Sequence, residues 1–211
     1  MNPRILASKV KGLQNGAIGK QVISRYNEFQ EFKNKSEEEW FSELCFCILT
    51  ANTSSEMGLR VQKAVGFDGF YNLSPKKLVQ TLKKAGSRFY NRRAEFIVDA
   101  RKHFGLKEKI SEFENDRIAR EYLAKNVKGF AFKEASHFLR NTGSNNVAIL
   151  DKHVVNLLAE YSIIPERPKT VNSKNYLKIE SRLDKFAEKV SLNHSQLDLY
   201  LWYMQTGKVL K

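Results

Sequence analysis

The stretch NVKGFAFKEASHFLRNTGSNNVAILDKH, residues 126–153, decides the fold. It opens on the end of one helical pattern and turns at a glycine, Gly129. A second helical pattern then runs through Arg140, and a polar loop and the short apolar run VAIL follow it. The run ends at a single aspartate, Asp151. We therefore expect a helix, a tight turn and a second helix, with Lys133 and Asp151 as the chemically notable residues.

Lys133 follows the turn and so lies in the first turn of the second helix. The positive end of the helix macrodipole disfavours an ammonium group there and favours the neutral amine. A neutral lysine amine is a nucleophile that forms Schiff bases with carbonyl-like carbons. The alternative interpretation is an ordinary solvated lysine on a helix surface.

Asp151 ends the run VAIL and precedes the periodic stretch VVNLLAEY, which is the place of an N-cap. A carboxylate at a helix N-terminus is stabilised in its ionised form. Such a group is suited to facing a positive charge that develops during a reaction. The alternative is that Asp151 serves only as a cap.

Composition favours a helical, nucleic-acid-binding protein. The 211 residues include 42% hydrophobic residues, which is enough for one domain or two small lobes with a real core. Only 4 prolines and 11 glycines interrupt the chain, and no convincing strand appears, because VAIL is short and isolated. The formal net charge of +13 predicts attraction to a polyanion, usually nucleic acid. The alternative is a lysine-rich surface without such a partner.

Several classes of protein are excluded. Cys45 and Cys47 are two positions apart on an expected helix and face different directions, so we expect core thiols and no disulfide. The chain lacks a four-cysteine set for an iron–sulfur cluster, and its 4 histidines show no metal-ligand spacing. It also lacks an apolar run of membrane-spanning length and a signal-peptide pattern, so we expect an intracellular protein.

Helical periodicity and capping residues predict an all-α fold. Ser36 and Glu39 form a capping-box pattern that starts a strong helix with Trp40, Leu44 and Cys47 on its buried face. Ser74-Pro75 predicts another helix start. That helix is expected at residues 75–84, and others at 1–35, 58–66, 92–104 and 114–125. The helix after the hairpin turn runs through Arg140, the next runs from Asp151 through Tyr161, and the last two lie at 174–190 and 194–206.

The segment KEASHFLRNTG, taken with VAILDKHV, resembles the archaeal-type 8-oxoguanine DNA glycosylase/AP lyases. These form a compact second family within the helix-hairpin-helix DNA glycosylase superfamily. The similarity runs from FKNKSEEEWFSELCFCILTAN to LDLYLWYMQTGKVLK, which is nearly the whole chain. The expected architecture is two helical lobes with a helix-hairpin-helix motif and a DNA-binding cleft between them. Residues 36–133 form the lobe that ends in the hairpin, and residues 1–35 with 134–211 form the other.

The resemblance implies a base-excision repair enzyme that flips out 8-oxoguanine, excises it and nicks the abasic strand. Lys133 would be the catalytic nucleophile that forms the Schiff base, and Asp151 would be the catalytic carboxylate. No metal or organic cofactor is expected. The implied partner is double-stranded DNA containing 8-oxoguanine, bound by a monomer in the cytoplasm, on the nucleoid and away from membranes.

The resemblance also assigns pocket residues. Phe89 and Trp202 would stack on the extruded base, and Lys211 would lie in the pocket. Asn52 would fill the gap left in the duplex, and Arg88 would contact the orphaned cytosine or a phosphate. The alternatives are a core anchor for Phe89, a surface charge for Arg88, a helix cap for Asn52 and a frayed end for Lys211.

The hairpin departs from the family pattern. It usually reads glycine–apolar–glycine, whereas here Gly129 and Phe130 are followed by Ala131. Ala131 fits the turn only with a negative φ, or at a cost of roughly 1 kcal/mol or more. Gly129 and Lys128 are the hairpin residues expected to contact DNA.

Two other functions fit the same residues. A glycosylase for another oxidised base would use the same scaffold with a different pocket. A non-catalytic helix-hairpin-helix protein would use Lys133 only to contact a phosphate.

Overall fold

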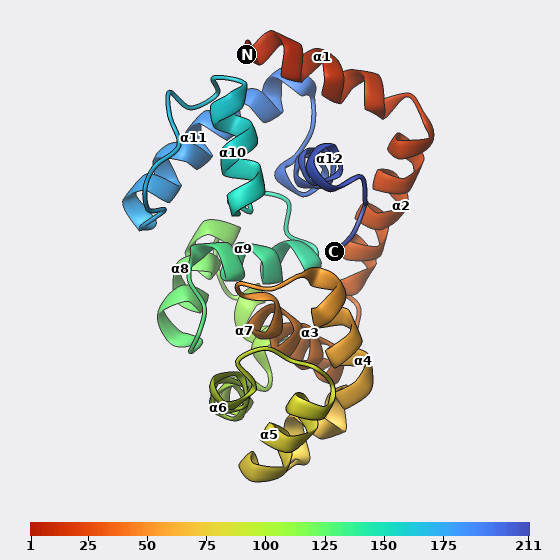
Figure 1. Ribbon diagram of the computed structural model, residues 1–211, viewed down its shortest axis with the longest axis vertical. Helices are drawn as coiled ribbons and strands as arrows, with labels where there is room; N and C mark the ends of the chain where they lie inside the picture. The colour runs from red at the N-terminus through yellow and green to blue at the C-terminus, as the bar shows by residue number, and fades with distance from the viewer. The chain divides into compact units, whose positions relative to one another are not determined.

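The computed structural model describes residues 1–211 and consists of twelve α-helices and one 3-10 turn, with no strand (Figure 1). This confirms the all-α prediction. No helix has both the length and the apolar character needed to cross a membrane. The elements are α1 (Pro3–Gln14), α2 (Ala17–Phe32), α3 (Glu37–Thr50), α4 (Ser55–Asn72), α5 (Pro75–Lys84), α6 (Tyr90–Ala100), η1 (Arg101–His103), α7 (Leu106–Ser111), α8 (Asp116–Asn126), α9 (Phe132–Asn141), α10 (Lys152–Glu160), α11 (Ser173–Val190) and α12 (His194–Thr206).

The helices form two compact units. The central unit is Phe32–Thr142, and the terminal unit combines Met1–Glu31 with Gly143–Lys211. The lobe boundaries expected from the sequence lie after residues 35 and 133, and the second of them falls inside α9. Because α9 packs against α3 and α8, the whole helix belongs to the central unit.

Helix α3 is the centre of the central unit, and α4, α6, α7 and α9 pack around it. Its first turn is closed by the predicted capping box: Ser36 N–H donates to Glu39 Oε2 at 3.1 Å, and Glu39 N–H donates to Ser36 Oγ at 3.3 Å. Contacts on all sides bury nearly every residue from Trp40 onward. One buried residue is charged: Glu43 accepts a hydrogen bond from Asn141 Nδ2 at 2.6 Å and so ties α9 to α3.

The two cysteines of α3 lie in this core. Cys45 and Cys47 are free thiols, and each has 0% of its surface exposed. Burial raises the pKa of the Cys45 thiol well above its usual value. The prediction of core thiols without a disulfide is confirmed.

Two helix predictions have the wrong bounds, and a glycine lies at each error. The expected helix 1–35 breaks after Gln14, and α2 begins at Ala17. A Cβ at Gly19 would lie 2.0 Å from the Gln14 carbonyl oxygen, so only glycine lets the end of α1 come this close to α2. The expected helix 58–66 continues to Asn72 as α4, across a kink where Gly66 has a φ of 66°. Helix α7 was not predicted at all.

The hairpin between α8 and α9 is closed by a bond from Phe130 N–H to the Val127 carbonyl at 3.1 Å. Gly129 has a φ of 90°, and a Cβ there would lie 2.4 Å from a ring carbon of Phe96. Ala131 is extended with a φ of −117°, so it meets the condition set by the sequence without left-handed strain. The turn therefore needs glycine at 129 and tolerates alanine at 131.

Replacement of Gly129 by alanine should destabilise the protein by roughly 2 kcal/mol or more, because left-handed strain and the clash with Phe96 add together. Gly105→Ala is the matched control, since Gly105 has a φ of 91° and open space around its Cβ position. It should lose only about 1 kcal/mol. Urea unfolding of both variants measures the difference. Equal losses would show that the Phe96 ring moves aside freely.

Candidate active site

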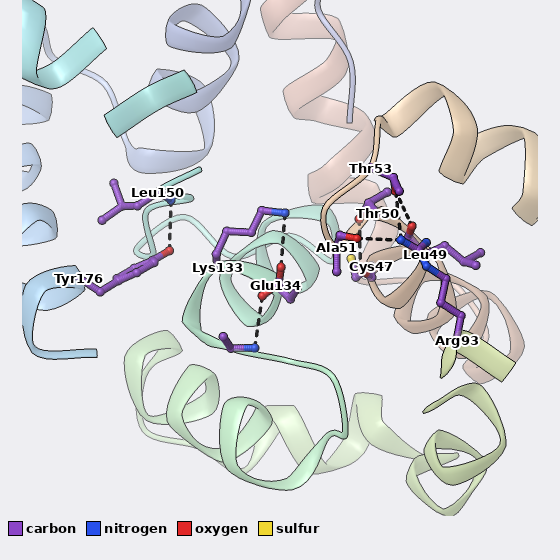
Figure 2. A network of polar contacts seen from close by, with 11 residues as sticks. Cys47, Leu49, Thr50, Ala51, Thr53, Arg93, Lys133, Glu134, Leu150 and Tyr176 are labelled. Atoms are coloured by element: carbon purple, nitrogen blue, oxygen red, sulfur yellow. Dashed lines mark hydrogen bonds and ion pairs between the residues drawn. The ribbon is translucent and has the colours of Figure 1, made fainter. Parts of the chain in front are cut away.

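Lys133 is the second residue of α9, and its amine lies beside a carboxylate. Nζ is 3.5 Å from Glu134 Oε1, and the other oxygen, Oε2, accepts the Ala131 N–H at 3.2 Å (Figure 2). The Glu134 side chain has only 14% of its surface exposed, and the Lys133 side chain 25%. One partly buried carboxylate therefore joins the last hairpin residue to the amine.

The Lys133 amine therefore lies at the N-terminus of α9 with the Glu134 carboxylate as its neighbour. Glu134 did not figure in the sequence analysis, although its place three residues after Ala131 is that of a capping-box glutamate. The uncharged amine stays a prediction.

Asp151 is the N-cap of α10, as predicted. Its Oδ1 accepts the Val154 N–H at 2.8 Å, and its side chain is half-buried. The preceding residues Val147–Leu150 are buried but pair with no strand. Their backbone groups need partners, because an unpaired buried amide or carbonyl is costly.

Two side chains of α11 supply these partners. The Tyr176 hydroxyl donates to the Ala148 carbonyl at 2.6 Å. It accepts the Leu150 N–H at 3.2 Å (Figure 2). Glu180, one helical turn later, accepts the Ala148 N–H at 2.9 Å. These bonds take the place of a neighbouring strand and hold the segment that ends at Asp151.

Trp202 lies on α12, which packs against α10. Its indole meets the His153 ring edge to face, with centroids 5.4 Å apart and planes at 88°. His153 is two residues after Asp151, so the terminal unit places Trp202 beside the aspartate-bearing end of α10. Sequence reasoning missed His153 because no spacing relates it to Trp202. Lys211 is half-exposed beyond Gly207, which ends α12 with a φ of 71°.

Asn52 and Phe89 share an uncommon backbone conformation. Both are exposed, and their φ angles are 56° and 53°. Phe89 has 56% of its surface exposed, so the alternative of a core anchor is wrong. The alternative of a cap is wrong for Asn52, because Ser54 caps α4 instead. Arg88 is also exposed, with its guanidinium carbon 5.1 Å from the centroid of the Phe89 ring.

The hairpin residues expected to contact DNA are exposed. Lys128 Nζ forms a solvent-exposed ion pair with Glu95 Oε1 at 2.7 Å, and this hydrogen bond raises the pKa of Lys128. Such exposed pairs contribute little stability. The lysine therefore stays charged and can exchange Glu95 for a phosphate at little cost.

The predicted site residues are divided between the two units. The terminal unit holds Asp151, Trp202 and Lys211. The central unit holds the remaining six predicted residues, which are Asn52, Arg88, Phe89, Lys128, Gly129 and Lys133.

A family model described as 8-oxoguanine DNA glycosylase matches residues 22–192. This chain belongs to that family. A member from Methanocaldococcus jannaschii, named 8-oxoguanine DNA glycosylase/AP lyase, is 51% identical over 98% of this chain and 100% of its own length.

Solved structures of the family agree with the fold. The M. jannaschii 8-oxoguanine glycosylase/lyase, in complex with a 15mer DNA containing 8-oxoguanine, superimposes with a TM-score of 0.95 at 50% identity and covers 98% of this chain and 100% of that one. The 8-oxoguanine DNA glycosylase of Thermotoga maritima gives a TM-score of 0.92 at 42% identity, covering 100% of both chains.

We expect Tyr176→Phe to destabilise this family member by about 2 kcal/mol, because the Ala148 carbonyl and the Leu150 N–H both lose a buried partner. Tyr203→Phe is the matched control: Tyr203 is half-buried on α12, and no hydrogen bond involves its hydroxyl. It should change stability by less than about 0.5 kcal/mol. Urea unfolding compares the two. Equal effects would mean that the Tyr176 hydroxyl does not support this segment.

Proposed function

We propose that this chain removes 8-oxoguanine from duplex DNA as a bifunctional glycosylase/AP lyase, with Lys133 as the nucleophile and Asp151 as the electrostatic partner. The observation that carries the assignment is the placement of both groups at helix N-termini, on a chain that belongs to the 8-oxoguanine DNA glycosylase family along most of its length. Its place of action would be the nucleoid.

The base has to leave the helix before it reacts. An oxidised guanine inside a stacked duplex cannot be reached, so it is extruded at a cost of a few kcal/mol. The excess positive charge of the chain, +13, supplies sequence-independent attraction to phosphates. Arg88, Lys128 and the exposed backbone of Gly129 would contribute contacts to the DNA.

Aromatic and amide side chains would then hold the opened site. Phe89 is exposed and would stack on the extruded base, and Trp202 of the terminal unit would stack on it as well. Lys211 would complete the pocket. Asn52 would fill the gap left in the duplex, since its side chain is exposed on a short loop.

The chemistry begins when the neutral Lys133 amine attacks the sugar C1′. The bond from C1′ to the base breaks, the departing base takes up a proton, and the amine nitrogen gives one up. Opening of the sugar ring leaves a Schiff base between Nζ and C1′. Loss of a proton from C2′ then expels the 3′ phosphate, which nicks the strand, and water releases the enzyme by hydrolysis.

Asp151 would stabilise the positive charge that builds on the sugar as the base departs. A fixed carboxylate does this best when it is already oriented, because no reorganisation is then needed during the reaction. The cap bond to Val154 N–H and the bonds from α11 provide this orientation.

Lys133→Gln should abolish the covalent adduct that borohydride traps on DNA containing 8-oxoguanine, because glutamine has no nucleophilic amine. DNA binding should change by only a few-fold. The neighbouring variant Lys128→Gln is the control, and it should bind DNA more weakly yet still form the adduct at saturating protein. Strand cleavage at a normal rate by Lys133→Gln would contradict the assignment.

The same trapping experiment separates the alternatives. An adduct only with an oxidised pyrimidine would indicate a glycosylase for another lesion. Binding without an adduct on any lesion would indicate a non-catalytic helix-hairpin-helix protein.

Asp151→Asn should slow base release by roughly 100-fold, the effect expected when one electrostatic contact to the transition state is lost. Asparagine caps a helix as well as aspartate does, so the thermal unfolding midpoint should stay nearly constant. Single-turnover kinetics at saturating protein measure the rate. A normal rate would reduce Asp151 to a cap.

A further inference from the structure

Arg93 is a buried arginine that the mechanism above does not use. It lies on α6 with 3% of its surface exposed, and no carboxylate pairs with it. Its Nη2 donates to the Ala51 carbonyl at 2.7 Å and to Thr53 Oγ1 at 3.2 Å (Figure 2). The guanidinium therefore bonds the residue before Asn52 and the residue after it.

Burial of this charge is costly. Loss of water lowers the pKa of Arg93 to about 10, with a further contribution from the nearby charge of Arg88. Its Nη1 atom is buried and has no hydrogen-bond partner. An apolar side chain of similar volume would pack here without these costs, so packing alone does not account for an arginine.

The charge is instead matched to a helix end. Ala51 is the C-cap of α3, and the carbonyls at a helix C-terminus carry partial negative charge that attracts a cation. Thr53 adds directionality: its hydroxyl donates to the Leu49 carbonyl at 2.7 Å, which leaves its lone pairs for Nη2. The two N–H bonds of Nη2 serve both acceptors at once, and the rigid guanidinium plane fixes their directions.

These two bonds bracket a residue in a sparsely populated conformation. Asn52 has a φ of 56°, which needs support from its surroundings to persist in a non-glycine residue. The backbone of Arg93 also contacts Phe89: its N–H donates to the Phe89 carbonyl at 3.0 Å, in the first turn of α6. One residue thus connects the loop that carries Asn52 with the residue that would stack on the base.

We propose that Arg93 is a positioning residue, which presents the Asn52 side chain in the conformation that fills the gap left by an extruded base. This inference rests on the proposed function, because it requires that Asn52 act in the opened duplex. It assigns Arg93 no contact with DNA. Its effect should therefore appear only when a base is extruded from a duplex.

Arg101 provides a matched control in the same unit. Its Nε donates to the Phe70 carbonyl at 2.9 Å, and its Nη2 donates to the Leu73 carbonyl at 2.6 Å. It therefore also anchors a helix end, that of α4, but far along the chain from Asn52. Arg101→Met removes the same chemistry without touching the loop of Asn52.

The experiment is a double-mutant cycle read by single-turnover release of 8-oxoguanine from a duplex. Arg93→Met should slow release by ~10-fold, the effect of losing hydrogen bonds to a charged group. Asn52→Gly should slow it by about as much, because Arg93 is proposed to act only through the Asn52 side chain. Glycine is chosen because it keeps the left-handed backbone while removing the side chain. The double variant should be no slower than Asn52→Gly, and Arg101→Met should release the base at the normal rate.

A second substrate isolates the extrusion step. An abasic site in a single-stranded oligonucleotide presents no base to extrude and no gap to fill. Borohydride trapping on it should proceed at the normal rate for Arg93→Met. Arg93→Lys provides a second variant should the methionine variant fail to fold, and its smaller loss on the duplex should also vanish in the Asn52→Gly background.

The outcomes separate the two proposals. Additive losses in the cycle, a normal duplex rate for Arg93→Met, or an equal loss on the single-stranded abasic site would each overturn the role of Arg93. Absence of both base release and adduct for the unmodified protein would instead overturn the proposed function.

Discussion

The positive φ of Gly129, held against the ring of Phe96, is the constraint on which the arrangement around Lys133 depends. It turns the chain from α8 into α9 within five residues, so Lys133 falls in the first turn of the new helix. The Glu134 carboxylate accepts the Ala131 N–H with one oxygen and forms an ion pair with the Lys133 amine through the other. The family pattern of two glycines is thus reduced here to one, because only position 129 needs a left-handed backbone.

Helix ends carry most of the proposed chemistry. Lys133 lies at the start of α9, Asp151 caps α10, and Arg93 binds the carbonyl of Ala51, the C-cap of α3. Each end offers polar backbone groups that lack partners within the helix, and each orients a side chain or takes up a charge. An all-α chain without a metal cluster can in this way fix several functional groups on rigid elements.

Local signals were read correctly from the sequence. The caps at Ser36, Ser74 and Asp151 each depend on residues within one helical turn, and all three are present. The family, the two-lobed fold and the candidate site residues were predicted from the resemblance to known glycosylases. The break after Gln14 was missed because the close approach of Gly19 to the Gln14 carbonyl is a packing contact that periodicity does not show. The continuation of α4 to Asn72 was missed because the pattern does not show that the helix resumes after the kink at Gly66.

The supports of the site could not be predicted, because they join residues distant in sequence. Tyr176 and Glu180 hold a segment about 26 to 32 positions earlier in the chain. Arg93 reaches back 42 positions to Ala51. A single sequence shows that such residues are polar or aromatic, but their partners emerge only when the helices pack.

The two thiols of α3 are sheltered from the conditions under which this enzyme would work. Oxoguanine arises when oxidants reach DNA, and the same oxidants attack cysteines through the thiolate. Burial keeps Cys45 protonated, and both sulfur-bearing side chains are sealed inside the central helix bundle. Neither thiol therefore presents an exposed thiolate to the oxidants that create the lesion.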